Sequence, residues 1–92
     1  FDQQPLDAAS MVQTCLEAYK ITGNKDYHKK AILAFNWFLG KNHLNQMMYD
    51  ESTGGCYDGL SKNNVNLNQG AESTIAYLTS RLILEEFKRN NN

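Results

Sequence analysis

Helical spacing of apolar residues is the strongest feature of this sequence, and one long stretch, residues 41–69, lacks it. Three segments carry apolar side chains three or four positions apart, as a helix with one buried face requires: residues 6–21, 24–39 and 70–87. Pro5 suits the first turn of a helix, and Gly23 suits a left-handed helix end. Because few residues separate the first two segments, we expect an antiparallel hairpin, to which the third segment adds one long helix. The sequence predicts an all-α fold in a single domain, residues 1–92.

The stretch 41–69 is too long for an idle connection in a compact domain, so it is expected to be functional. Apolar residues at intervals predict that it is ordered: Met47, Met48, Tyr49, Cys56, Tyr57, Leu60, Val65 and Leu67. Residues 50–55 carry turn-forming residues between two apolar pairs, which predicts a short β-hairpin within the ordered loop. We expect the second helix to end before Gly40 and residues 88–92 to fray.

The charge balance argues against two classes of partner. Nine Lys and Arg residues stand against ten Asp and Glu residues, and the net charge is −1. Nucleic acids and anionic membrane surfaces bind proteins through clustered positive charge, which this composition does not supply. No apolar run approaches the roughly 20 residues that span a bilayer. Neither nucleic acid nor membrane is therefore an expected partner.

Cysteines and histidines are too few and too scattered to indicate a metal centre. Cys15 lies among apolar helix positions and is expected to behave as a small core residue. A bridge between Cys15 and Cys56 is the less favoured alternative, because no spacing brings the two together. His28 and His43 have no second ligand at helical spacing, and the glycines lack the lysine of a phosphate-binding loop. No metal or other cofactor is expected.

A polar run precedes the third helix and contains a carboxylate in the expected first helical turn. Amide side chains and this carboxylate alternate over a short distance: Asn66, Asn68, Gln69 and Glu72. One interpretation is structural, with Asn68 capping the helix and Glu72 stabilised by the helix dipole. The other is a binding surface, because Gln3, Gln4 and Asp7 crowd the start of the first helix in the same manner.

Amides and carboxylates together suit a ligand rich in hydroxyl groups. Each amide offers two donors and an acceptor, as hydroxyls do, and aromatic rings can cover the apolar face of a sugar. Trp37, Tyr49 and Tyr57 are candidates for that role, although a core position is the favoured interpretation for Trp37. Asp58 is a turn former before a glycine or, with Glu72, one of the two carboxylates that glycoside cleavage requires.

Four segments of this sequence together resemble a known family. They are residues 2–9 (DQQPLDAA), 34–42 (AFNWFLGKN), 54–60 (GGCYDGL) and 66–74 (NLNQGAEST). They look like the C-terminal end of a family of bacterial carbohydrate-associated proteins with an α/α toroid, related to six-hairpin glycosidases and sugar epimerases. Members are often described as glycosyltransferases or are fused to one. The resemblance extends over almost the whole chain.

The resemblance implies that this chain is the last part of a toroid of about a dozen helices. Its polar loop would then face the central cavity that holds sugars. The roles implied are catalytic for Glu72 and Asp58. Six residues are implied to bind substrate: Gln4, Asp7, Asn42, Tyr57, Asn68 and Gln69. Because most of the toroid is missing from the sequence, the chain alone is expected to be inactive.

The expected partners are a carbohydrate and the remaining hairpins of a longer chain. Apolar faces that normally meet those hairpins would be exposed, which makes self-association through them an expectation as well. Two alternatives remain: a non-catalytic helical interaction module, and a structural C-terminal cap of a glycosyltransferase. Unpaired thiols and the link to glycosyltransferases favour a cytoplasmic location.

Overall fold

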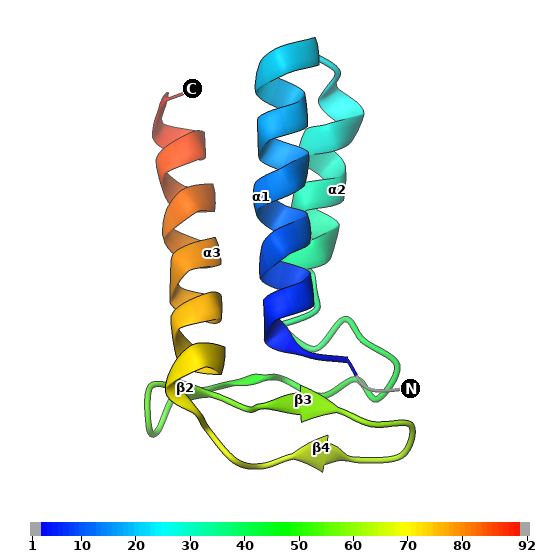
Figure 1. The fold of residues 1–92 in the computed structure, drawn as a ribbon, viewed down its shortest axis with the longest axis vertical. Coiled ribbons are helices and arrows are strands. Elements are labelled where there is room, and N and C mark those ends of the chain that lie inside the picture. The colour runs from blue at the N-terminus through cyan, green and yellow to red at the C-terminus, as the bar shows by residue number, and fades with distance from the viewer. Residues whose placement is uncertain (1–2, 91–92) are drawn as a thin grey trace.

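The computed structural model describes residues 3–90 and is mostly helical, as the sequence predicts (Figure 1). Helices α1 (Pro5–Thr22) and α2 (Lys25–Asn36) form an antiparallel hairpin, and α3 (Ala71–Asn90) runs along α1. The chain between α2 and α3 lies across one end of the three helices and holds four short strands. This segment, residues 37–70, forms a layer across the ends of the helices, and we call it the floor.

Local signals in the sequence account for the helical hairpin. Pro5 occupies the first turn of α1, and Gly23 ends it with φ +69° while its N–H donates to the Tyr19 carbonyl at 2.7 Å. The Asn24 side chain accepts a hydrogen bond from the Asp26 N–H at 3.0 Å, which caps the start of α2. The predicted ends of the hairpin loop are confirmed.

Two predicted helix ends are wrong for tertiary reasons. Helix α2 ends at Asn36, earlier than predicted, because the chain turns so that Phe38 becomes fully buried and its carbonyl accepts the Met48 N–H at 2.8 Å. Helix α3 continues to Asn90, whereas fraying was expected from residue 88. Buried Phe87 anchors that last part, with its ring 5.4 Å from the Tyr19 ring.

The core consists of two buried clusters stacked along the helices. The cluster nearer the floor contains Ala9, Phe38, Met48, Cys56, Leu60, Ala76 and Tyr77. The cluster at the other end contains Val12, Cys15, Leu16, Ala31, Leu84 and Phe87. Loop residues Met48, Cys56 and Leu60 are no more than 1% exposed and anchor the loop as predicted, whereas Met47 and Leu67, also predicted as anchors, are 48 and 67% exposed.

The floor is made of two antiparallel hairpins, of which the sequence predicted one. Strands β1 (Tyr49–Asp50) and β2 (Gly55–Cys56) form the predicted hairpin, with Tyr49 opposite Cys56. Strands β3 (Gly59–Leu60) and β4 (Val65–Asn66) form a second hairpin, with Leu60 opposite Val65. An isolated bridge pairs Leu60 with Gln3, so the start of α1 is attached to the second hairpin.

Both cysteines are buried and unbridged, as expected. Burial is the main cause that raises the pKa of the Cys56 thiol to about 12, and the charge of Asp58 adds to it.

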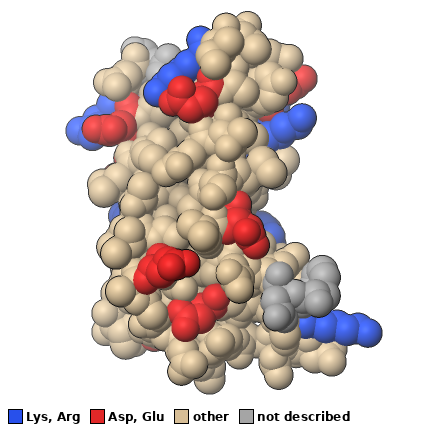
Figure 2. Space-filling view, viewed as in Figure 1, with Lys and Arg blue, Asp and Glu red and all other residues tan. Residues whose placement is uncertain are grey.

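Figure 2 shows charges of both signs around the upper end and separate acidic groups lower on the same face. Among residues 3–90, no helix has the length and apolar character needed to cross a membrane.

Candidate functional site

The attachment of Gln3 to strand β3 sets the geometry of the candidate site. Gln3 and Leu60 exchange two backbone hydrogen bonds, each 2.7 Å long. A Cβ atom on Gly59 would lie 2.8 Å from the Gln3 carbonyl oxygen, closer than carbon and oxygen can approach. Position 59 therefore requires glycine, since only glycine lets the two segments come this close.

A cavity of about 290 Å³ opens where these two segments meet, and we call it the polar cavity. Its lining residues come from the start of α1 and from the second hairpin: Gln3, Gln4, Asp58, Gly59, Leu60, Ser61, Asn64 and Asn66. Four amide side chains, one carboxylate and one hydroxyl thus converge on a single small space. This arrangement can match the donors and acceptors of a polyhydroxyl ligand.

Several polar groups of the cavity retain hydrogen-bonding capacity. The Ser61 hydroxyl donates to the Asn64 carbonyl oxygen at 3.1 Å, and the Asn66 Oδ1 accepts the Asn68 N–H at 3.1 Å. The Nδ2 groups of Asn64 and Asn66 form no hydrogen bond with any residue from 3 to 90. The exposed side chain of Gln4 likewise bonds to none of them. In Asn64 and Asn66, hydrogen bonds to the Oδ1 atom hold the side chain in place, and the Nδ2 group remains an unused donor.

Asp58 both lines the polar cavity and stabilises the start of α3. Its Oδ1 accepts two hydrogen bonds at 2.8 Å, from the Gly70 N–H and from the Ser73 hydroxyl, and so caps α3 from outside the helix. Asn68, which was predicted to cap this helix, does not do so. The Oδ2 atom of Asp58 has no partner in the described part of the chain. The carboxylate is therefore held in place through Oδ1, and its Oδ2 keeps the capacity to accept hydrogen bonds.

Tyr57 and Gln69, both predicted to bind substrate, belong to a closed cluster around Asp50 at the first hairpin. Asp50 Oδ2 accepts from the Gln69 Nε2 at 3.1 Å and the Tyr57 hydroxyl at 3.4 Å. Its Oδ1 accepts from the Ser52 N–H at 2.9 Å and the Ser52 hydroxyl at 2.7 Å. Gln69 Oε1 in turn accepts from the Thr53 hydroxyl at 2.7 Å. Asp50, which sequence reasoning missed, holds this cluster together.

The same hydrogen bonds change the acidity of the cluster. They lower the pKa of Asp50 below its ordinary value, with the Ser52 hydroxyl as the largest cause and Gln69 next. The pKa of Tyr57 is raised, first by partial burial and then by the nearby charge of Asp50. Both shifts favour an ionised Asp50 bonded to a neutral phenol, which is a stable structural arrangement.

Asn42 is also fully occupied by the backbone around it. Its Nδ2 donates to the carbonyls of Trp37 and Gln46, at 2.9 and 2.8 Å. Its Oδ1 accepts from the N–H groups of Leu44 and Gln46, at 3.2 and 3.1 Å. The side chain therefore shapes the turn after α2.

A second cavity, about 350 Å³, lies between the lower ends of α1 and α2, and we call it the Trp37 groove. It is lined by Gln3, Gln4, Asp7, Ala8, Met11, Leu33, Ala34, Trp37 and Lys41. The structure thus brings Gln4 together with Asp58 in one cavity and with Asp7 in the other. Exposed Glu72, in the first turn of α3, and Asn68 line neither cavity.

Gln3 connects the two cavities to the aromatic residues. Its Oε1 accepts the Trp37 indole N–H at 2.9 Å and lies 3.3 Å from His43 Nδ1. His43 Nε2 lies 2.7 Å from the Ser61 carbonyl oxygen. Tyr49, another candidate for a sugar platform, stacks on Tyr77 with centroids 4.5 Å apart. Gln3 is a residue whose central position no local pattern reveals, because its partners are distant in sequence.

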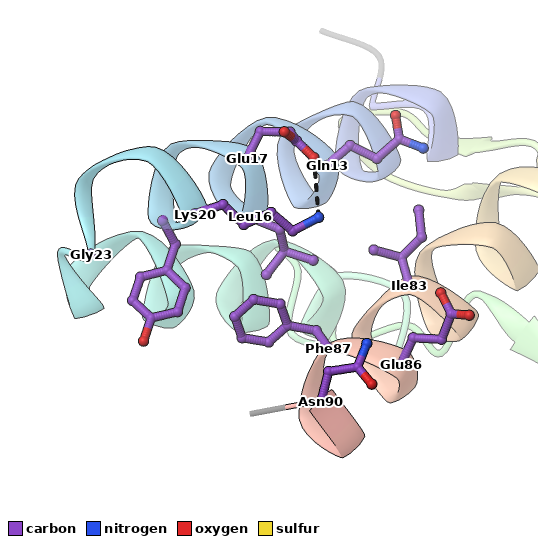
Figure 3. Close-up of a pocket in the computed structure, with 10 residues that line it drawn as sticks. Gln13, Leu16, Glu17, Lys20, Gly23, Ile83, Glu86, Phe87 and Asn90 are labelled. Atoms are coloured by element: carbon purple, nitrogen blue, oxygen red, sulfur yellow. Dashed lines mark hydrogen bonds and ion pairs between the residues drawn. The ribbon is translucent and has the colours of Figure 1, made fainter. Parts of the chain in front are cut away.

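A larger cavity of about 700 Å³ lies between α1 and α3 at the opposite end of the helices (Figure 3). Leu16, Ile83 and Phe87 point into it, and the rim carries Glu17, which binds Lys20 at 3.4 Å. Two of its lining side chains, Gln13 and Asn90, are amides, against four in the polar cavity, so it matches a ligand rich in hydroxyl groups less well.

No metal-binding group of three or more His, Cys, Asp or Glu side chains occurs in the part of the chain from 3 to 90. No protein-family model matches the chain, and no curated protein matches it significantly. The geometry of the polar cavity and of the Trp37 groove, with the side chains that line them, is therefore the basis for a functional proposal.

Proposed function

We propose that this chain forms part of the sugar-binding wall of a larger, carbohydrate-active α/α toroid, and that the polar cavity binds one sugar ring. The observation that carries the proposal is the convergence of four amide side chains and the Asp58 carboxylate on one cavity of about 290 Å³. That volume is at the lower end of ordinary small-molecule sites, which begin at about 300 Å³. It suits a single ring better than a larger cofactor.

The hydrogen-bonding state of the cavity supports hydroxyl recognition. Asp58 is oriented by the Gly70 N–H and the Ser73 hydroxyl, so its Oδ2 can accept from a ligand without losing its own anchoring bonds. The amides of Gln4 and Asn66 supply donors beside it. Because a hydroxyl both donates and accepts, adjacent carboxylate and amide groups can bind it through two bonds at once.

In this proposal, catalysis requires the rest of the toroid. Glycoside hydrolysis uses two carboxylates on either side of one bond, and Asp58 and Glu72 are the carboxylates of this chain assigned to that chemistry. The exposed side chain of Glu72 has no hydrogen-bond partner among residues 3–90, so its carboxylate is able to act on a substrate held by neighbouring hairpins. The chain alone then binds sugar and turns over none.

The proposal is tested by titrating the ¹⁵N-labelled chain with glucose, mannose and galactose and following backbone and side-chain amide signals by NMR. We expect at least one sugar to shift the signals of Gln4, Asn64 and Asn66 at millimolar concentration. The Asn63 amide, exposed at the tip of the β3–β4 hairpin and outside the cavity lining, is the internal reference. If none of the three sugars moves the cavity signals, the polar cavity is not a sugar site.

A second role, as a helical interaction module, is favoured by the exposed face of α3. Ile75, Leu78 and Leu82 are 60, 40 and 61% exposed and lie three and four positions apart. We propose that another hairpin of the toroid covers this face and that, without it, two copies of the chain associate there. Leu82→Glu should then reduce the mass measured by light scattering, whereas Leu33→Glu, at a 68% exposed position on α2, should not. An unchanged mass for Leu82→Glu would contradict this role.

A further inference from the structure

We infer that the ligand is an oligosaccharide of at least two sugar residues, and that the Trp37 groove binds the ring next to the one in the polar cavity. This inference rests on the function proposed above and adds a substrate class to it. The two cavities share Gln3 and Gln4 as lining residues, so they adjoin each other at this segment. A ligand that crosses Gln3 and Gln4 would occupy both.

The Trp37 ring is held as a rigid platform. Its indole N–H donates to Gln3 Oε1 at 2.9 Å, and its ring meets the buried Phe38 ring edge-on, with centroids 5.3 Å apart. The side chain is half-buried and lines the groove. Because its indole N–H and one edge are already satisfied, an apolar ring face is the surface that it can offer to a ligand.

The rest of the groove matches the two-sided character of a sugar ring. Met11 and Leu33 continue the apolar surface and are 52 and 68% exposed. Asp7 and Lys41 supply polar groups of opposite charge in the same lining. A sugar presents an apolar face and a rim of hydroxyls, so it can contact both kinds of surface at once. Since the two charges balance, the groove favours a neutral sugar over an anionic one.

Gln3 is placed to contact a ligand at the junction. Its Oε1 is engaged by Trp37, whereas its Nε2 forms no hydrogen bond within the described range 3–90. The backbone of Gln3 is fixed by the two hydrogen bonds to Leu60. The side chain is therefore oriented at both ends and keeps its amide donors for a group that lies between the two cavities, as a glycosidic oxygen or an adjacent hydroxyl would.

The test compares the affinity of the chain for single sugars and for short linear chains. Glucose, mannose and galactose are titrated alongside their linear 1,4-linked trisaccharides, with calorimetry for affinity and NMR for the binding site. Trp37 is the single tryptophan of the sequence and lines the groove, so its fluorescence and its indole N–H signal can be assigned to this residue without ambiguity. We expect one trisaccharide to bind at least tenfold more tightly than its monosaccharide and to change both Trp37 signals.

The outcomes separate this inference from the function on which it rests. If no sugar of either length moves the signals of Gln4, Asn64 and Asn66, the proposed function fails and the inference fails with it. If monosaccharide and trisaccharide bind the polar cavity equally well and leave the Trp37 signals unchanged, the inference alone is overturned. In that case the polar cavity remains a single-sugar site.

Variants of the platform provide an independent readout. Trp37→Leu should reduce the trisaccharide affinity at least fivefold more than the monosaccharide affinity, and Trp37→Phe should recover part of the trisaccharide loss by restoring an aromatic face. Tyr27→Leu is the matched control, because Tyr27 is a half-buried aromatic residue of α2 that lines neither cavity. Circular dichroism establishes that each variant is folded. Wild-type trisaccharide affinity in folded Trp37→Leu would overturn the inference, and the wild-type Trp37 signals decide it if that variant does not fold.

Discussion

The two hairpins of the floor have strands of the same length but differ in how their polar side chains are used. In the β1–β2 hairpin, both oxygens of Asp50 accept hydrogen bonds, from Ser52, Tyr57 and Gln69. In the β3–β4 hairpin, which borders the polar cavity, Ser61 bonds to Asn64, but the Nδ2 groups of Asn64 and Asn66 have no partner among residues 3–90. The carboxylate of the first hairpin is thus fully bonded within the protein, whereas the second hairpin keeps amide donors that have no partner in the described chain.

This difference shows that polar composition does not by itself identify a binding site. Gln69 and Asn42 are amides in a loop, as Asn66 is, but their hydrogen bonds are made inside the protein. A group that is already bonded on all sides would lose those bonds on binding a ligand, and the loss offsets the gain. A group that is fixed by neighbours and still has an open donor or acceptor binds at lower cost.

The largest expected effect is that of adding a side chain at Gly59, where Gln3 and the β3–β4 hairpin are in close contact. In Gly59→Ala the new Cβ meets the Gln3 carbonyl, a backbone atom that cannot rotate away. We expect a loss of about 1–3 kcal/mol in the free energy of unfolding and loss of sugar binding. The measurements are chemical denaturation and the NMR titration.

Gly54→Ala in the β1–β2 hairpin is the matched control for Gly59→Ala. Gly54 has φ +74° and open space around its missing Cβ, so alanine there costs about 1 kcal/mol of conformational strain. Because Gly54 lies in the β1–β2 hairpin, which does not line the polar cavity, sugar binding should survive. Wild-type stability and binding in Gly59→Ala would show that the contact between Gln3 and β3 does not build the cavity.

The second prediction compares Asp58, which lines the polar cavity, with Asp50 of the β1–β2 hairpin. Asp58→Asn keeps an oxygen to cap α3 but removes the charge that faces the polar cavity. Hydrogen bonds to charged groups contribute about 1.5–3 kcal/mol, so sugar affinity should fall roughly tenfold or more. Asp50→Asn should leave the affinity unchanged, since Asp50 does not line the cavity. Calorimetry measures both, and equal losses in the two variants would remove the distinction between the hairpins.

The helices could be predicted because their signals are local. Apolar spacing located all three, and Gly23 and Asn24 fixed the loop between the first two within a few residues. The errors arose where distant contacts decide. Buried Phe87 extends α3, and Asp58 caps that helix from 12 residues before Gly70, whereas local reasoning assigned the cap to Asn68.

The candidate site could be predicted only in part, for the same reason. Gln4 and Asp58 were chosen for their chemistry and do line the polar cavity. Gln3 was not assigned a site role, because its importance comes from a backbone pairing with Leu60 and an indole bond from Trp37, both remote in sequence. Hydrogen-bond saturation is a property of the folded chain, and composition does not encode it.

The third prediction concerns an exposed amide on each of two surfaces. Gln4→Ala removes a side chain that has no partner within residues 3–90, so the free energy of unfolding should change by less than about 0.5 kcal/mol. Sugar affinity should fall about threefold to tenfold, as for one neutral hydrogen bond. Gln13→Ala, on α1 and outside the polar cavity and the Trp37 groove, is the control and should change neither property. Unchanged affinity in Gln4→Ala would place the ligand elsewhere.

The smallest expected effect is the pH dependence of the closed cluster. The pKa of Asp50 is lower in the folded protein than its ordinary value, chiefly because the Ser52 hydroxyl and Gln69 bond to its charged form. An acid with a lowered folded pKa contributes stability that is fully present above its ordinary pKa and is lost as pH falls through the folded value. The Tm difference between wild type and Asp50→Asn should therefore be largest at neutral pH and shrink below about pH 4. Thermal unfolding followed by circular dichroism from pH 7 to pH 2 measures it, and a difference independent of pH would mean that the carboxylate charge contributes nothing to this hairpin.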